Sequence, residues 1–140
     1  MGKASEQYAY FTISGDFDPD WISSRLRCLP TEAWRKGDLH PRNRRERQCS
    51  RWSLHSRLPH QASIEEHIAD VLVQMEQNPD AFCAVAEQFD GCMQLVGYLH
   101  DGYQGLILTR PMMQAMGRYG LKMDADLYWL WADSREDTQP

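Results

Sequence analysis

The residues with the clearest capacity for chemistry are arginines, and they are concentrated in one short part of the chain. From Arg35 to Arg57 there are eight basic residues and two acidic ones, a local balance of +6 in a chain whose formal net charge is −5. Such a segment attracts an anionic partner, although acidic side chains of the same chain can also neutralise it. The central candidates for binding such a partner are Arg44, Arg45, Arg47 and Arg51.

Two histidines are the best candidates for proton transfer, because imidazole titrates near neutral pH. His55 and His100 are both expected on the outward faces of neighbouring strands. An enzyme that uses this pair as acid and base is one hypothesis, and two solvated histidines are the other. The sequence contains no Gly-x-Ser-x-Gly elbow, no His-Glu-x-x-His motif and no glycine-rich phosphate loop, so no residue is assigned as catalytic. A protein without catalysis is the preferred interpretation.

The spacing of the acidic, histidine and cysteine residues does not favour a metal site. Asp16, Asp18 and Asp20 repeat as at the start of a calcium-binding loop. Trp21 and Arg27 replace the glycine and glutamate that such a loop needs at its sixth and twelfth positions. The five histidines and four cysteines include none of the close ligand pairs that structural zinc sites use. We predict neither a metal ion nor a cofactor.

The length of 140 residues, 42% of them hydrophobic, indicates a single domain that buries its own core. We place this domain at residues 8–132, with an arginine-rich loop at residues 39–50 and flexible segments at residues 1–7 and 133–140. The four cysteines form no Cys-x-x-Cys pair, no hydrophobic signal segment precedes Tyr8, and no run is long enough to span a membrane. We therefore predict a reduced, cytoplasmic protein that does not reside in a membrane.

Hydrophobic periodicity predicts the elements that must position these residues. Alternation predicts strands at residues 8–14, 51–58, 92–100, 105–109 and 124–131, and helical spacing predicts helices that begin near Asp18, Ser63, Pro79 and Arg110. Residues 30–38 are expected to be irregular or a single helical turn, and Asp101-Gly102 is typical of a hairpin turn. The order β-α-β-α-β-β-α-β, with the central helical region counted once, predicts an α+β fold. Its helices pack on one face of a largely antiparallel five-stranded sheet.

The other face of this sheet is expected to be polar and rich in aromatic residues. Alternation assigns to it Tyr8, Tyr10, Thr12, Arg51, Ser53, His55, Arg57, Gln94, Tyr98, His100, Asp126 and Tyr128. An antiparallel sheet commonly has one face in water; the alternatives are an interface between two copies of the chain and a groove for a partner. Beside the four arginines, the candidate partner-binding residues are Tyr10, His55, Tyr98 and His100.

Single-stranded nucleic acid is a further candidate partner, because arginines beside tyrosines on a sheet are one arrangement that binds it. The sequence has no RNP-like string, however, and the chain outside the arginine-rich part is acidic. The preferred interpretation is a small binding or interaction domain that holds a protein or another acidic partner with its polar sheet face and arginine-rich loop. A homodimer is a candidate assembly.

Several segments together resemble a known family. They are residues 8–11, 15–19, 30–38 and 50–54, followed by a long helix that contains Glu66-His67. From Tyr8 to Trp131 the chain resembles a bacterial family known only as a domain of unknown function, number 4279 in its series. The resemblance implies a bacterial origin and one compact domain. The family brings no established activity, cofactor or catalytic residue.

Overall fold

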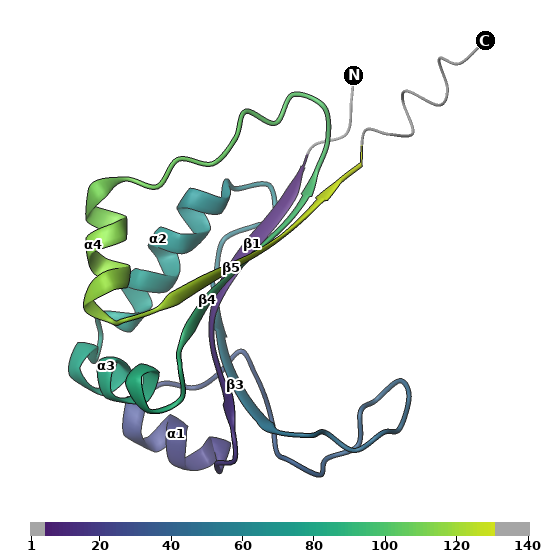
Figure 1. The fold of residues 1–140 in the computed structure, drawn as a ribbon, viewed down its shortest axis with the longest axis vertical. Coiled ribbons are helices and arrows are strands. Elements are labelled where there is room, and N and C mark those ends of the chain that lie inside the picture. Colours follow the sequence, from purple (N-terminus) through teal and green to yellow (C-terminus); the bar gives the residue numbers. More distant parts are fainter. Residues whose placement is uncertain (1–4, 131–140) are drawn as a thin grey trace.

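The computed structural model of the chain describes residues 5–130, which form a five-stranded sheet and four helices (Figure 1). The strands are β1 (Glu6–Gly15), β2 (Glu32–Trp34), β3 (Ser50–His55), β4 (Cys92–Leu99) and β5 (Lys122–Trp129). The helices are α1 (Pro19–Leu26), α2 (Ile64–Met75), α3 (Pro79–Gln88) and α4 (Arg110–Arg118). The predictions for residues 1–4 and 131–140 lie outside the described residues.

The sheet has the strand order β2-β3-β1-β4-β5, with β1 in the centre. β1 pairs antiparallel with β3 and β4, β2 pairs antiparallel with β3, and β4 pairs parallel with β5. All four helices lie on the same side of this sheet in Figure 1. The predicted α+β class is therefore confirmed, as a mixed sheet that is mostly antiparallel.

The predicted hairpin after Asp101-Gly102 is wrong. Residues 105–109 form no strand. The Ile107 N–H donates to a carboxylate oxygen of Glu65 on α2 at 3.1 Å, while Leu106 and Leu108 pack against the core. The alternation that suggested a strand therefore arises from a segment lying along a helix. The chain then passes through α4 and returns as β5, because a parallel neighbour of β4 requires such a crossover connection.

The fifth strand of the sheet is instead β2, which lies within residues that were expected to be irregular. Glu32, Ala33 and Trp34 pair with Ser53, Trp52 and Arg51 of β3. Three residues give too short an alternation to be recognised in a sequence. The observed order is thus β-α-β-β-α-α-β-α-β, and the predicted number of strands is correct although one of them was misplaced.

The helices begin where the sequence indicates. Ser63 accepts a hydrogen bond from the Glu66 N–H at 3.1 Å, and the Ser63 N–H donates to the Glu66 carboxylate at 3.0 Å, which confirms the capping box of α2. α1, α3 and α4 each have proline in the first turn, where a missing N–H costs no helical hydrogen bond.

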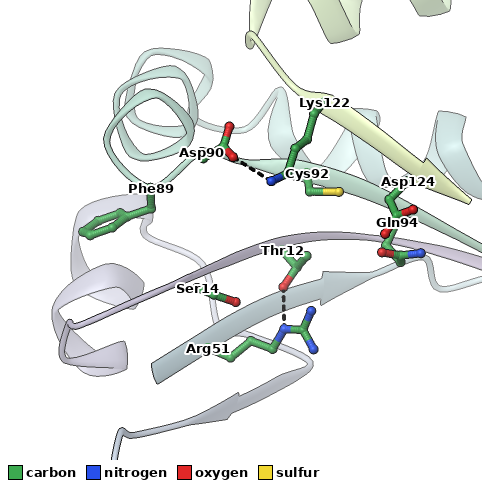
Figure 2. Close-up of a pocket in the computed structure, with 9 residues that line it drawn as sticks. All are labelled: Thr12, Ser14, Arg51, Phe89, Asp90, Cys92, Gln94, Lys122 and Asp124. Carbon is green, nitrogen blue, oxygen red and sulfur yellow. Dashed lines mark hydrogen bonds and ion pairs between the residues drawn. The ribbon is translucent and has the colours of Figure 1, made fainter. Parts of the chain in front are cut away.

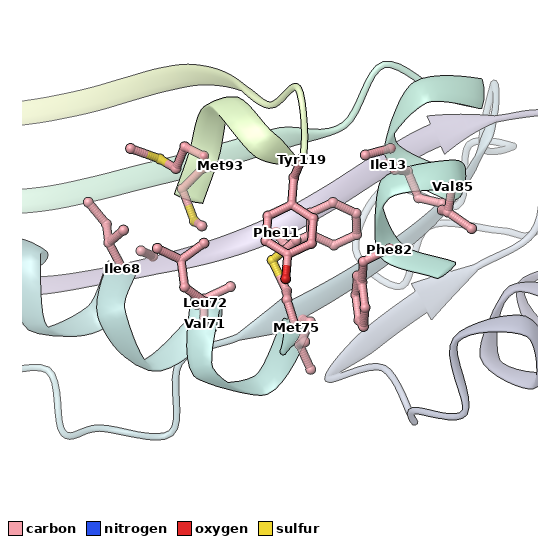
Figure 3. Packing of buried hydrophobic residues seen from close by; sticks show 14 of the residues in the cluster. Phe11, Ile13, Ile68, Val71, Leu72, Met75, Phe82, Val85, Met93 and Tyr119 are labelled. Atoms are coloured by element: carbon pink, nitrogen blue, oxygen red, sulfur yellow. The ribbon is translucent and has the colours of Figure 1, made fainter. Parts of the chain in front are cut away.

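The hydrophobic core lies between the sheet and the helices. Figure 3 shows Phe11 of β1 and Met93 of β4 packed against Val71 and Met75 of α2 and Phe82 of α3. The Phe11 and Phe82 rings meet edge to face at 5.4 Å between centroids. All five of these side chains are buried. A binding site on the sheet must therefore use its other face.

Candidate functional site

The sheet face opposite the helices, called the open face below, carries the side chains that alternation assigned to it. Tyr10 of β1 lies opposite His55 of β3 and Gln94 of β4, and Gln94 lies opposite Asp124 of β5. Directly opposed residues project from the same face of a sheet. The predicted alternation is therefore in register across these four strands. No helix of residues 5–130 covers this face, as Figure 1 shows.

Aromatic rings stack in the middle of the open face. The rings of Tyr10 and His55 are nearly parallel, with centroids 4.4 Å apart, and Tyr8 stacks on both Tyr10 and His60. Burial raises the pKa of the Tyr10 hydroxyl and lowers the pKa of His55 below its ordinary value near 6.5. His55 is therefore neutral at pH 7, and it belongs to a packed aromatic group.

A pocket of about 280 Å³ opens at one end of the open face (Figure 2). It forms where β1 ends and β3, β4 and β5 begin, so that four strands contribute to it. The residues that line it are Thr12, Ser14, Arg51, Phe89, Asp90, Cys92, Gln94, Lys122 and Asp124. Most of these side chains are polar, and two of them are cationic. The pocket is therefore suited to a polar group.

Arg51 is the cation best placed to bind a ligand in this pocket. Its Nε donates to the Thr12 hydroxyl at 3.1 Å, and this bond holds the guanidinium group beside β1. Thr12 is in turn held by Ser53, whose hydroxyl lies 2.9 Å away. No carboxylate of the described residues forms an ion pair with Arg51. Its terminal nitrogens are thus oriented and available for an anion.

The opposite side of the pocket carries a paired lysine and an uncharged thiol. Lys122 Nζ lies 2.6 Å from a carboxylate oxygen of Asp90, so its charge is already matched. Cys92 is buried, and this burial raises the pKa of its thiol, which argues against a reactive thiolate at neutral pH. In Figure 2 Arg51 and Lys122 approach the pocket from opposite sides.

The arginine-rich loop leaves the sheet next to this pocket. Arg47 stacks on the ring of Trp34, with its Cζ 3.6 Å from the ring centroid, and the Arg51 Cζ lies 5.6 Å from the same centroid. The Trp34 Nε1 donates to the Cys49 carbonyl at 3.1 Å. Trp34 therefore interacts both with Arg47 of the loop and with Arg51 of the pocket.

The loop is held together by its own backbone. The Gly37 N–H donates to the Arg47 carbonyl at 2.9 Å, and the Arg47 N–H donates to the Asp38 carbonyl at 2.7 Å. Leu39 and Glu46 form an isolated antiparallel bridge. Arg44, near the tip, has a left-handed backbone with φ of 60°. The segment thus projects from the sheet as a bonded hairpin, on the side away from the helices (Figure 1).

Ion pairs divide the eight basic residues into two groups. Arg35 pairs with Asp18 at 2.8 Å, Lys36 lies 3.7 Å from Asp16, and Arg57 pairs with Asp70 of α2 at 2.7 Å. The other five form no ion pair with a carboxylate of residues 5–130: Arg42, Arg44, Arg45, Arg47 and Arg51. Ion pairs within residues 5–130 thus neutralise the ends of the segment, and none of them engages the five arginines of its centre.

The structure separates other residues that the sequence placed together. β1 lies between β3 and β4, so the strands of His55 and His100 are not neighbours. His55 lies level with Gln94, and His100 follows β4 six residues further along, which places the two imidazoles roughly 20 Å apart. They cannot form one acid and base pair. Tyr98 also lies far from the pocket, stacked on Tyr128 with ring centroids 5.1 Å apart.

Several pocket residues were missed because the sequence does not reveal strand register. Ser14, Cys92, Lys122 and Asp124 have the same parity as the outward residues of their strands, so alternation could have assigned them to this face. Their convergence depends on the paired starts of β4 and β5, where Cys92 lies opposite Lys122. The expected hairpin in place of that parallel pair hid this convergence.

A buried histidine on the helix side has a structural role. His67 of α2 is completely buried, and its Nδ1 is hydrogen-bonded to the Ser56 hydroxyl beyond β3. Burial lowers the pKa of His67, so the ring is neutral at pH 7. This bond ties α2 to the segment after β3, away from the open face.

The fold and this surface define a small α+β domain with one sheet face sealed by helices and the other face open and polar. The chain belongs to the family described as Domain of unknown function (DUF4279), whose sequence model matches residues 5–130. No curated protein and no solved structure matches it. Among the helices of residues 5–130, none combines the length and the apolar character needed to cross a membrane.

Proposed function

We propose that the domain is a binding module that holds an acidic segment of a partner protein, with Arg51 in the pocket and the arginine-rich loop beside it as the anion-binding groups. The observation that carries this proposal is the group of five arginines that form no ion pair in the described residues. Two of them, Arg47 and Arg51, lie near the ring of Trp34. Arginine binds carboxylates through two parallel hydrogen bonds, which favours it for this task.

The open face supports an extended partner. The Tyr10 and His55 rings lie along the sheet from the pocket and offer apolar area to a chain whose acidic end is held by Arg51. Tyrosine and arginine, like tryptophan, are enriched among the few residues that dominate the binding energy of protein interfaces. The partner would therefore cross from the loop, over the pocket, towards the aromatic group.

A polypeptide fits this face better than a nucleic acid. Asp124 lines the same pocket as Arg51, and Asp126 follows on the same face of β5. A nucleic acid carries a phosphate at every nucleotide, and these carboxylates would repel it. A peptide can place its acidic residues at the arginines and neutral residues at the aspartates.

The test compares two variants with the same change in net charge. The first replaces Arg44, Arg45 and Arg47 by glutamate. The matched control makes the same change at Arg25 of α1, at Arg27 directly after α1 and at Arg110 of α4. The probe is a fluorescent peptide of alternating glutamate and glycine, followed by anisotropy at low salt, with single-stranded oligothymidylate as the competing probe. We expect the loop variant to bind the peptide roughly tenfold more weakly and the control to change little.

Three other results would overturn the proposal. Equal losses in both variants would show that only net charge matters. Tighter binding of the oligonucleotide would make the protein a nucleic-acid binder. A stable dimer that Tyr10→Arg dissociates, with no peptide binding by the monomer, would assign the open face to a second copy of the chain.

We also propose a bacterial origin and a reduced, cytoplasmic location. Four free cysteines support the reducing compartment, because an oxidising one favours disulfides. Mass spectrometry of the protein trapped with an alkylating agent in its host should find all four thiols reduced.

A further inference from the structure

The outer edge of β5 is a second surface of interest, because no strand of residues 5–130 pairs with it. β5 is the last strand in the sheet order and has eight residues, whereas β2 at the other edge has three. Seven of the eight residues of β5 are exposed, although seven of the eight residues of its neighbour β4 are buried. A long and regular edge strand is a template for another strand, and most proteins shorten or cover such edges.

The backbone of β5 turns defined groups towards this edge. The Lys122 N–H donates to the Gly91 carbonyl at 3.1 Å, and the Leu130 N–H donates to the Leu99 carbonyl at 2.8 Å, both towards β4. The N–H and C=O of one residue point to the same side of a strand, and successive residues alternate. The intervening odd-numbered residues, including Met123, Ala125 and Leu127, therefore direct both groups away from the sheet.

The side chains along this edge specify what would fit beside it. Asp124 and Asp126 lie on the open face, two residues apart. Met123, Ala125 and Leu127 lie on the helix side, where Leu127 packs against the core and Met123 remains 41% exposed. A neighbouring strand would place one set of side chains against the carboxylates and the other beside the apolar residues.

We propose that the β5 edge binds an extended peptide segment as a sixth strand, with basic residues alternating with apolar ones. The basic residues face Asp124 and Asp126, and the apolar residues extend the layer beneath the helices. Main-chain hydrogen bonds to Met123, Ala125 and Leu127 supply affinity, and the alternating pattern supplies specificity. This surface shares Asp124 with the lining of the pocket, but it includes neither Arg51 nor the arginine-rich loop, which lies by the opposite edge of the sheet.

Charge disfavours a second copy of the chain as the occupant. Two β5 strands that pair antiparallel around a two-fold axis at Ala125 would place Asp124 opposite the second copy's Asp126. With the axis at Asp126, the two copies of that carboxylate would oppose each other. Like charges directly opposite on one sheet face destabilise the pairing.

The first test removes one outward N–H and leaves the β4 ladder intact. Ala125→Pro deletes a donor that points away from the sheet, a position where edge strands tolerate proline. Ala125→Val keeps the donor and is the matched control. The probe is a capped octapeptide in which lysine alternates with valine, measured by calorimetry. We expect the proline variant to bind roughly tenfold more weakly and the valine variant to bind within about twofold of the parent.

A second pair of measurements holds even if Ala125→Pro unfolds the strand. N-methylation of the valine nitrogens should abolish binding if the peptide runs antiparallel to β5, and N-methylation of the lysine nitrogens should abolish it if the peptide runs parallel. Asp124→Lys should reverse the preference from the lysine peptide to a glutamate counterpart. Binding of both methylated peptides, or no reversal, would overturn the proposal.

Hydrogen exchange tests directly whether the outward amides of β5 are free before the peptide binds. In the free, full-length protein the amides of Met123, Ala125 and Leu127 should exchange rapidly and gain protection when the lysine peptide binds. Protection of these amides without the peptide would show that another part of the chain or a second copy already covers the edge, and that result would also overturn the proposal. The glutamate variants of the loop should leave the binding of the lysine peptide unchanged within about twofold, which separates this surface from the anion-binding site.

Discussion

The two faces of the sheet are built from alternate residues of the same strands, yet different forces determine them. Phe11 points into the core and contacts Trp52 and Phe82, whereas its neighbour Tyr10 points outward and stacks on His55. The helix side is determined by packing, which any stable fold requires. The open side carries aromatic rings, and cations that form no ion pair within residues 5–130, neither of which folding alone requires. The open face is therefore the part of the sheet that the proposed partner would contact.

The strongest test of this comparison replaces two adjacent residues. Phe11→Ala should lower the free energy of unfolding by about 3–5 kcal/mol, because it leaves a cavity beneath α2 and α3. Tyr10→Ala, one residue earlier in the same strand, should cost about 1 kcal/mol or less because its ring is partly exposed. Urea unfolding measures both values. Similar losses for the two variants would show that the open face also belongs to the core.

His67 extends the comparison to acid stability. His67→Ala should cost roughly 2 kcal/mol at pH 7, because it empties a buried site and leaves the Ser56 hydroxyl without its partner. The folded state lowers the pKa of His67, so the unfolded chain binds a proton first as the pH falls. The stability linked to His67 is therefore complete above its ordinary pKa near 6.5 and is lost as the pH falls below that value.

Urea unfolding between pH 8 and pH 5 checks this dependence. The parent protein should lose stability below about pH 6.5, and the His67→Ala variant should lose less over the same interval. His40→Ala, in the arginine-rich loop, is the control at a distant histidine. An identical pH dependence in the parent and the His67 variant would contradict the assignment.

Removing the cap of α2 should lower the stability of the fold by a smaller amount and leave the open face unchanged. Ser63→Ala removes the acceptor for the Glu66 N–H at the start of α2 and should cost about 1 kcal/mol. Thermal unfolding measures this loss. Affinity for the acidic peptide should stay within about twofold, since α2 lies on the other side of the sheet. Ser63→Asp, which keeps a capping oxygen, should restore most of the stability.

The smallest effect is expected at the far end of the open face. Tyr98→Ser removes a ring that is 39% exposed and stacked on Tyr128, so the cost should be on the order of 0.5–1 kcal/mol. Because this residue lies four residues along β4 from Gln94, the nearest pocket residue of that strand, its replacement should not change affinity for the acidic peptide. A clear loss of affinity in anisotropy would extend the binding surface to this end.

Local features were predictable from the sequence, and long-range pairing was not. Ser63 with Glu66, and the prolines of three helices, act within one turn of chain, so their positions follow from residue types alone. The alternation in β1 and β3 placed Tyr10, Arg51 and His55 on the correct face. The register that opposes Cys92 to Lys122 depends on a crossover through α4, and no local pattern encodes it.

The candidate site shows the same division. Arg47 and Arg51 were identifiable from the sequence as members of a strongly basic segment. Both arginines lie near Trp34 because β2, a strand of only three residues, pairs with β3. The loop between the two strands makes this pairing possible. The expected partnership of His55 and His100 failed because β1 inserts between their strands. Strand order therefore decides which residues share a site.

The central position of β1 has a practical consequence for engineering the molecule. Glu6 lies opposite Tyr98, and Tyr98 lies opposite Tyr128, so the start of β1 and the end of β5 lie about 10 Å apart at one corner. A linker of a few glycines between residues 5 and 130 would span that gap, and new ends could be opened between Asp101 and Gly105. Fluorophores or immobilisation handles attached at this corner would stay some 20 Å from the pocket, roughly the length of six strand residues.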